Sequence, residues 1–214
     1  MTRRLILASA SPRRQELLQD LSYPFDIVAA DCEEYFDRSL PIASAIEQIA
    51  RQKALTVWEQ HPEAVVLGAD TMVCFKDQMM GKPENREDAY RMLKQLSGKT
   101  HTVVSGVAIV WKGKAEFFHE KTSVTFYELE EELLERYLDS NEPYDKAGAY
   151  GIQGMGKLFV RELRGDYFNV MGLPIAAVYR HLKAYLEKTK KFCFMVEKIG
   201  NAYYNPVFDS LRKK

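Results

Sequence analysis

Apolar residues follow two spacings along this chain, short unbroken runs typical of buried strands and three-to-four-residue repeats typical of amphipathic helices. The run Leu5–Ala8 predicts a strand, and a helix is expected to begin at Pro12 directly after it. A second strand is predicted over Phe25–Val28. Residues 42 to 60 predict a long helix with one buried face, because their apolar positions recur at helical spacing: Ile46, Ile49, Ala50, Ala54 and Val57.

The middle of the chain predicts mainly strands. Short apolar runs at 64–67 and 72–75 are separated by the Gly68-Ala69-Asp70-Thr71 segment, which we interpret as an interruption. A helix over about 86–96 follows and is expected to end at Gly98. Two long strands, 101–111 and 115–126, flank Lys112-Gly113-Lys114, a sequence typical of a hairpin turn.

The last third predicts an acidic helix near 130–139, a glycine-rich loop over 145–156, a strand near 158–163 and a helix from Pro174 to about Lys188. Strands that alternate with helices indicate a mixed α/β fold, here assigned to one domain over residues 1–188. Residues 189–214 mix lysines with aromatic residues and form a C-terminal extension of unknown role. It packs on the body or on a partner, or it is a partly ordered terminus.

Composition and charge narrow the class of protein. With 46% hydrophobic residues in 214, the chain can bury a large core, so intrinsic disorder is excluded. Thirty basic and thirty acidic residues cancel, which argues against a broad duplex-binding face and against a polybasic membrane anchor. The apolar run near the amino terminus is too short for a secretory signal, and we predict a cytoplasmic protein without a membrane span. Widely spaced cysteines and histidines argue against disulfides and transition metals: Cys32, Cys74, Cys193, His61, His101, His119 and His181.

The start of the first helix carries the strongest signal for chemistry. Ser11 is expected to cap the helix and Pro12 to be its first residue, so Arg13 and Arg14 fall in the first turn. Cations are unfavourable there unless an anion binds, because the helix dipole already places positive charge at this end. With the Ser9 hydroxyl and free backbone N–H groups nearby, the segment fits a phosphate. The alternative is a surface helix whose arginines point into solvent.

Two charged residues occur where apolar ones are expected. Lys53 lies on the apolar stripe of its helix, four residues after Ile49 and four before Val57, so it either extends to solvent or serves a function. Asp70 lies between two apolar strand segments. A carboxylate in that position is paired, bound to a metal or catalytic, unless it only forms a turn.

Three further segments carry weaker signals. Glu33-Glu34 follows a strand and would suit magnesium, although acidic loops are usually only solvated. Lys82 lies in a rigid Gly81-Lys82-Pro83 turn. Residues 151–158 nearly match a P-loop, but Leu158 lacks the required hydroxyl and the segment is expected to enter a strand. The glycines instead favour close approach to a ligand, with Gln153 offering a donor and an acceptor to a base.

Six segments, in this order, closely resemble the Maf family of nucleoside triphosphate pyrophosphatases: Leu7–Arg14, Gly68–Val73, Gly81–Pro83, Leu96–Gly98, Asp145–Gly154 and Val170–Pro174. The resemblance implies an elongated, two-lobed α/β fold with a mixed sheet and a cleft between the lobes, shared with inosine triphosphate pyrophosphatases. It also implies hydrolysis between the α and β phosphates, dependent on a divalent cation, Mg²⁺ or Mn²⁺. The Ala149–Gly154 segment, with glutamine at 153, resembles the branch that acts on dTTP and UTP.

The resemblance also implies roles for individual residues. Asp70 matches the family's proton acceptor, with Lys53 and Lys82 as further catalytic groups, and Glu34 matches a carboxylate that with Asp70 holds the metal. Arg13, Thr71 and Gln153 match the family positions associated with substrate choice. Ser9 and Arg14 match positions that, together with Lys53 and Lys82, hold the triphosphate.

Two alternatives stay open on the sequence alone. One is a pyrophosphatase for modified or purine nucleotides, which would use the same machinery. The other is a nucleotide- or DNA-binding regulator of septum formation, which the family's link to cell division suggests and the neutral net charge disfavours. We therefore expect a nucleoside triphosphate substrate, no stable nucleic-acid partner and no membrane. The resemblance also allows a homodimer.

Overall fold

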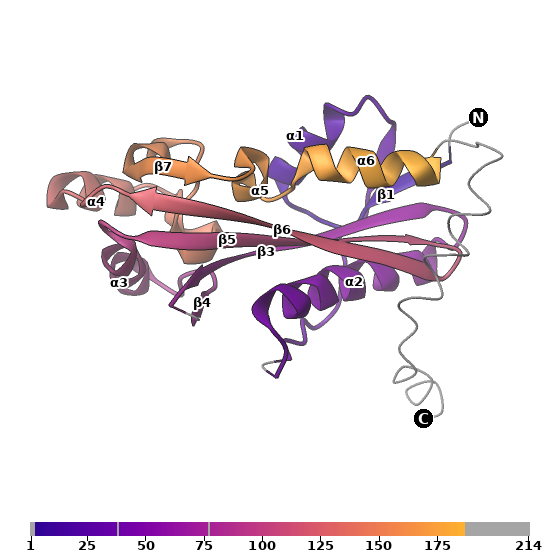
Figure 1. Ribbon diagram of the computed structural model, residues 1–214, viewed down its shortest axis with the longest axis horizontal. Helices are drawn as coiled ribbons and strands as arrows, with labels where there is room; N and C mark the ends of the chain where they lie inside the picture. The colour runs from indigo at the N-terminus through magenta and orange to yellow at the C-terminus, as the bar shows by residue number, and fades with distance from the viewer. Residues whose placement is uncertain (1–2, 38, 77, 187–214) are drawn as a thin grey trace.

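The computed structural model describes residues 3–37, 39–76 and 78–186. Its apolar strands pair side by side in a seven-stranded mixed sheet (Figure 1). The sheet order is β2-β1-β3-β5-β6-β7, and β4 pairs with β3. Strand β1 runs parallel to β2 and β3, and the other pairs are antiparallel. The strands are β1 Leu5–Leu7, β2 Phe25–Ile27, β3 Val65–Phe75, β4 Gln78–Met80, β5 Thr100–Trp111, β6 Lys114–Phe126 and β7 Val160–Arg164.

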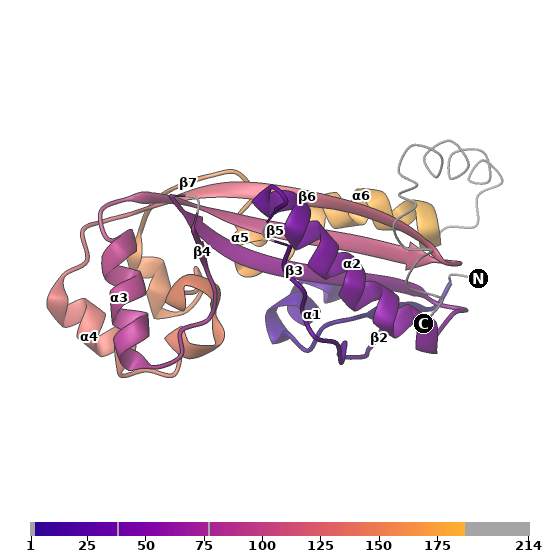
Figure 2. The same cartoon turned by 90° about the horizontal axis from the view of Figure 1, so that it is seen from below.

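Helices cover both faces of the sheet and pack against the apolar side chains that each face presents. On one face, α2 packs against Val66 and Ala108, and on the other α1 and α6 pack against Leu67 and Ile109. At the far end, α3 and α4 enclose a separate core around Phe126 (Figure 2). The helices are α1 Pro12–Gln19, α2 Ile42–Gln60, α3 Arg86–Leu96, α4 Glu131–Leu138, α5 Tyr167–Met171 and α6 Ile175–Leu186, with 3-10 turns η1 Pro143–Asp145, η2 Ala147–Ala149 and η3 Met155–Phe159.

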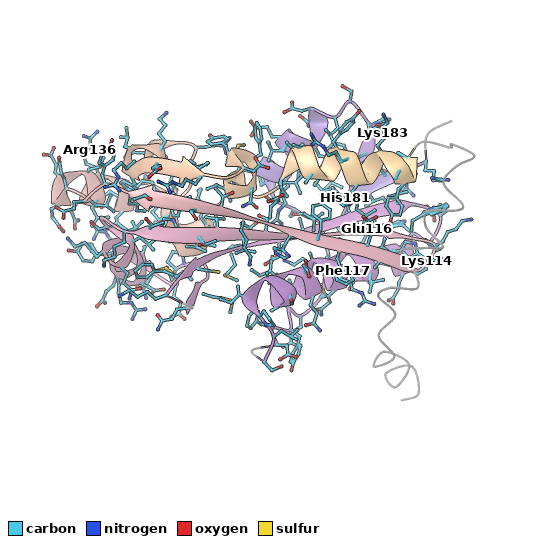
Figure 3. All side chains as sticks on the ribbon, viewed as in Figure 1. Lys114, Glu116, Phe117, Arg136, His181 and Lys183 are labelled. Carbon is cyan, nitrogen blue, oxygen red and sulfur yellow. The ribbon has the colours of Figure 1, made fainter. Side chains whose placement is uncertain are left out.

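The molecule is elongated, with separate clusters of buried residues at its two ends (Figure 2). The end with α1, α2 and α6 is called the first lobe, and the end with α3 and α4 the second lobe. Strands β3, β5 and β6 pass through both lobes. Val66, Val110 and Phe117 belong to or pack against a cluster of the first lobe, whereas Val73, Val103 and Val124 belong to the cluster of the second. The expectation of a mixed α/β fold with two lobes is therefore confirmed, and the lobes share one sheet. Helix α6 is attached to this sheet through Glu116 on β6, whose carboxylate accepts the Tyr185 hydroxyl at 2.6 Å and lies 2.5 Å from His181 Nδ1 (Figure 3).

Several expected boundaries were wrong. Residues 68–71 do not interrupt a strand: they continue β3, because each pairs with a residue of β5. Lys157 and Leu158 lie in the 3-10 turn η3 before β7, where a direct entry into a strand was expected. Strand β4 and helix α5 were missed because each is too short to show a period. The extension 189–214 and Cys193 lie outside the described residues.

Glycines at the sheet centre let α2 approach closely. A Cβ built on Gly68 would lie 2.4 Å from the Ala50 carbonyl oxygen and 2.8 Å from the Ala54 Cβ. On the neighbouring strand, a Cβ on Gly106 would lie 2.6 Å from the Ile46 carbonyl oxygen. The backbone of α2 therefore lies directly on β3 and β5 where no side chain intervenes.

Replacing Gly68 with alanine is expected to destabilise the protein by about 3 kcal/mol, because the new methyl group can be accommodated only if α2 moves away from β3. The free energy of unfolding from urea titration measures this loss. Gly81→Ala is the matched control, since a methyl group at that position would meet nothing within 4 Å. Equal stability of the two variants would contradict the close packing of α2 on β3.

Across the part of the chain that the structure describes, no helix is both long and apolar enough to cross a membrane.

Candidate functional site

A pocket of about 980 Å³ lies along one edge of β3. Strand β1 pairs with this edge as far as Leu67, and β4 pairs with it from Val73 onward. Between these points the edge carries Asp70 and Thr71, while β5 occupies the opposite edge. The pocket is lined by Ser9 from the first lobe and Tyr150 from the second, so the expected cleft between the lobes is present.

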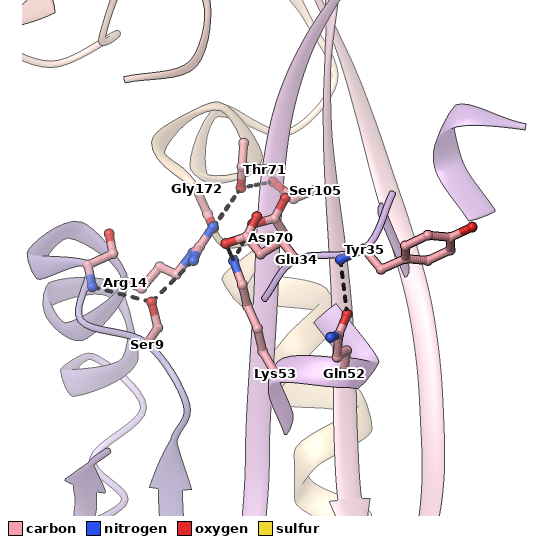
Figure 4. Close-up of polar contacts among 11 residues, drawn as sticks. Ser9, Arg14, Glu34, Tyr35, Gln52, Lys53, Asp70, Thr71, Ser105 and Gly172 are labelled. Carbon is pink, nitrogen blue, oxygen red and sulfur yellow. Dashed lines mark hydrogen bonds and ion pairs between the residues drawn. The ribbon is translucent and has the colours of Figure 1, made fainter. Parts of the chain in front are cut away.

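Lys53 joins two carboxylates inside this pocket (Figure 4). Its ammonium lies 2.7 Å from Asp70 Oδ1 and 2.8 Å from Glu34 Oε1. Burial disfavours the charged lysine, but the two carboxylates outweigh this effect and raise the pKa of Lys53 above its ordinary value. Of the two sequence alternatives, Lys53 therefore does not extend into bulk solvent; its side chain is only 15% exposed and paired within the pocket.

The local packing explains how the lysine reaches Asp70. Gly68 brings the α2 backbone onto β3 at Ala50 and Ala54, and Lys53 lies between these two residues on α2. Asp70 is two residues after Gly68, so its side chain leaves the same face of the strand. The Asp70 side chain is paired with Lys53, one of the alternatives that the sequence left open, and it lies in a strand rather than in a turn.

Arg14 also lines the pocket, and polar contacts surround its guanidinium (Figure 4). Its guanidinium donates to Ser9 Oγ at 3.1 Å, to Thr71 Oγ1 at 3.1 Å and to the Gly172 carbonyl oxygen at 2.9 Å. Burial lowers the pKa of Arg14, and the nearby Asp70 carboxylate opposes that effect. An arginine remains protonated in spite of such a shift, so a fixed positive charge is held beside Asp70.

The helix start differs in detail from the expectation. Ser11 is the N-cap and Pro12 the first helical residue, as expected, but the Ser11 side chain accepts no capping hydrogen bond. Instead, the Ser11 N–H donates to Ser9 Oγ at 3.2 Å. The two arginines also diverge: Arg14 enters the pocket wall, whereas Arg13 Nη1 lies 3.3 Å from Asp145 Oδ2 on the second lobe.

The second lobe contributes the opposite wall. Lys82 and Gln153 both line the pocket, Lys82 from the segment after β4 and Gln153 from the loop before η3. Tyr150 is buried beside them, and its hydroxyl lies 2.7 Å from His101 Nε2. Burial lowers the pKa of His101 to about 4, so this imidazole is neutral at physiological pH.

Sequence reasoning gave no role to three residues that shape the site. The Gly172 carbonyl orients Arg14 and also accepts the Thr71 hydroxyl at 3.2 Å. Ser105 on β5 lies 2.8 Å from the same hydroxyl. Glu142 lines the pocket beside Gln153. Only Gly172 left a sequence signal, a glycine in one of the segments that carry the resemblance, and its φ of 123° explains why glycine occurs there.

The donor set at Asp70 and Glu34 fits a hard divalent cation. Two carboxylates already converge on one positive charge, the Lys53 ammonium, and carboxylate oxygens are the ligands that Mg²⁺ prefers. Within the described ranges, no group of three or more histidine, cysteine or acidic side chains could hold a metal. Such a cation would therefore take its remaining ligands from water or from substrate oxygens, which is usual for Mg²⁺.

Comparisons with known proteins show which family this chain resembles over most of its length. A family model described as "Maf-like protein" matches residues 4–185. A dTTP/UTP pyrophosphatase of Bacillus cereus is 49% identical over 183 residues, which cover 86% of this chain and 96% of that protein. A dTTP/UTP pyrophosphatase of Bacillus velezensis is 48% identical over 185 residues, which cover 86% of this chain and 98% of that protein. Among solved structures, a nucleoside-triphosphatase / dITP/XTP pyrophosphatase of Mycobacterium abscessus covers 93% of this chain and 96% of its own, with a TM-score of 0.42 and 16% identity.

Proposed function

The chain belongs to the Maf-like protein family, and we propose that it hydrolyses dTTP and UTP between the α and β phosphates, releasing a nucleoside monophosphate and pyrophosphate. The activity of its relatives supports this function, and so does one structural observation. Asp70 and Glu34, whose carboxylates both contact Lys53, lie in one pocket with the cations Lys53 and Arg14. Phosphoanhydride hydrolysis needs this combination, because charge must be neutralised on the phosphates while a base directs water.

Each residue then has a chemical task. Asp70 accepts a proton from the water that attacks the α-phosphorus, and Lys53 holds the Asp70 carboxylate in a single orientation through the 2.7 Å contact. Arg14, Lys53 and Lys82 neutralise the triphosphate, so that charge can build up on the pyrophosphate as it leaves. Ser9 and Thr71 keep the Arg14 guanidinium in place for that purpose.

A divalent cation, Mg²⁺ or Mn²⁺, would be held by Asp70 and Glu34 and would supply further neutralisation of phosphate charge. The Lys53 ammonium, which lies between the two carboxylates, would share with the cation the balancing of their negative charge.

Gln153 decides where the base is expected. Both walls of the pocket carry cations and carboxylates: Arg14, Lys53, Glu34 and Asp70 on the first lobe, and Lys82, Lys146, Glu142 and Asp145 on the second. Charge by itself therefore does not orient the nucleotide. The base is expected on the second lobe because Gln153 presents there an amide that can pair with the adjacent carbonyl and N–H of uracil or thymine.

Replacing Gln153 with glutamate is expected to lower kcat/KM for dTTP and UTP by about 10- to 100-fold, because an ionised carboxylate cannot donate to a base carbonyl. Turnover of purine triphosphates should change far less. Initial rates with each nucleotide measure the ranking, and Gln95→Glu on α3, outside this pocket, is the matched control. An unchanged nucleotide ranking in the Gln153 variant would argue against its proposed contact with the base.

The function itself is tested by pyrophosphate release from a panel of canonical and modified nucleoside triphosphates, with Mg²⁺ or Mn²⁺. Selective, metal-dependent cleavage of dTTP and UTP is expected. Activity confined to purine or modified nucleotides would overturn the assignment of the base, and inactivity on every nucleotide would overturn the enzyme assignment. Salt-dependent DNA binding by an inactive protein would favour the regulator instead.

Three further statements stay predictions. A cytoplasmic location follows from the sequence, and a homodimer and a part in septum formation follow from the family resemblance. Each is independent of the chemistry proposed for the pocket.

A further inference from the structure

The segment that carries Gln153 is held at both ends by side chains from outside it. At its start, the Gly151 N–H donates to the Tyr137 hydroxyl at 3.3 Å. At its end, the Met155 N–H donates to both carboxylate oxygens of Glu142, at 2.9 and 3.1 Å. Gln153 lies between these two contacts, so the backbone on either side of its amide is restrained.

Glu142 lies directly against the peptide that follows Gln153. Gly154 has a φ of 59°, and a Cβ built on it would lie 2.4 Å from Glu142 Oε2. The carboxylate therefore occupies the space that a side chain at position 154 would need. With glycines at both 151 and 154, the free segment has many accessible conformations, and the contact with Glu142 selects one of them.

Glu142 is itself fixed by its surroundings. Its N–H donates to Ser140 Oγ at 3.2 Å, and its carbonyl oxygen accepts from Lys146 Nζ at 2.5 Å. Lys146 also lies 2.6 Å from Asp145 Oδ1, and the other oxygen of Asp145 faces Arg13. The side chain thus projects from a braced turn rather than from a loop that could move with it.

We propose that Glu142 is a positioning residue for pyrimidine selection: its carboxylate fixes the Met155 N–H and thereby holds the Gln153 amide where it meets the base. This inference rests on the proposed function, because it assumes that Gln153 reads a pyrimidine. A hydrogen bond from an N–H to a charged acceptor is stronger than one between neutral groups, so the restraint is a firm one. Losing it requires the nucleotide to order the segment at the expense of binding energy.

Two substitutions at Glu142 distinguish the effect of its hydrogen-bond acceptor from the effect of its negative charge. Glu142→Ala removes the acceptor and the charge, whereas Glu142→Gln keeps an acceptor oxygen and removes only the charge. We expect Glu142→Ala to lower kcat/KM for dTTP and UTP by about 10-fold, mainly through KM, and Glu142→Gln to keep most of it. With dATP, both variants should stay within about 3-fold of the unmodified protein. Glu132→Ala, an exposed position on α4, is the matched control.

A second readout does not depend on turnover. Amide hydrogen exchange of the Met155 N–H in the free protein is expected to accelerate in Glu142→Ala and to stay slow in Glu142→Gln and in the control. Unchanged exchange, or an equal loss of activity on every nucleotide, would overturn the positioning role. If the unmodified protein shows no preference for dTTP and UTP, the proposed function fails, and the exchange result still reports whether Glu142 holds the segment.

Discussion

Replacing Asp70 with asparagine is expected to lower kcat by about 1,000-fold, because an amide cannot accept the proton of the attacking water. The substitution keeps the size of the side chain and an oxygen that can accept from Lys53 at the position of Oδ1. Lys53 also keeps Glu34 as a charged partner. The fold should therefore survive, and the loss should appear in kcat far more than in the midpoint of thermal unfolding.

Steady-state rates with dTTP, together with a thermal unfolding curve, measure both quantities. Asp31→Asn removes a carboxylate from the exposed loop after β2, outside the pocket, and serves as the matched control. A folded Asp70→Asn protein with nearly full activity would remove Asp70 from the chemistry. Some other group would then have to direct the water.

Replacing Lys53 with methionine is expected to lower kcat/KM by about 100-fold, because one cation is lost from the triphosphate site and Asp70 loses the contact that orients it. Methionine keeps a flexible apolar stem of similar length, so the packing of α2 is largely preserved. Two carboxylates are left facing each other without the ammonium between them. This change should also destabilise the fold, by about 1 to 3 kcal/mol because the Asp70–Lys53 pair is mostly buried.

The pH dependence of this destabilisation identifies its cause. The two carboxylates raise the pKa of Lys53 in the folded protein above its value of 10.5 in the unfolded chain. The ion pair therefore stabilises the fold fully below pH 10.5, and this contribution is lost as the pH rises through the folded pKa. The stability gap between the unmodified protein and Lys53→Met should narrow in that range.

Urea unfolding at several pH values measures the gap, with Lys114→Met at the distant hairpin as the control (Figure 3). Lys53→Arg, which keeps the positive charge, should retain more stability than Lys53→Met. A gap that persists unchanged above the pKa would mean that lost packing, and not the ion pair, accounts for the effect.

Much of the fold followed from local pattern, and the limits of local pattern are visible at particular residues. Helix α2 and the long strands β5 and β6 each extend far enough for their pattern of apolar residues to be recognised in the sequence. The middle of β3 was misread because glycine, alanine, aspartate and threonine resemble a turn. They form a strand because β5 pairs with each of them, which is a tertiary effect that propensity does not contain.

The site was predictable one residue at a time, but its contacts were not. Lys53 and Asp70 each stood out as charges in apolar surroundings, yet their pairing depends on the close approach of α2 at Gly68. The divergence of Arg13 from Arg14 depends on Asp145, which lies 132 positions away from Arg13 along the chain. No local sequence feature marks Glu142, because its role comes only from the backbone N–H that it meets.

The passage of β3, β5 and β6 through both lobes affects the length of ligand that the pocket can accept. A hinge motion between the lobes would have to bend β3 and β5 near the Asp70–Gly106 pair, in the middle of two long paired strands. The separation between Arg14 and the second-lobe turn that holds the Gln153 segment is therefore constrained by the shared sheet before any nucleotide arrives. A ligand must span that separation with its own length, so the sheet limits which distances from base to phosphate the pocket accepts.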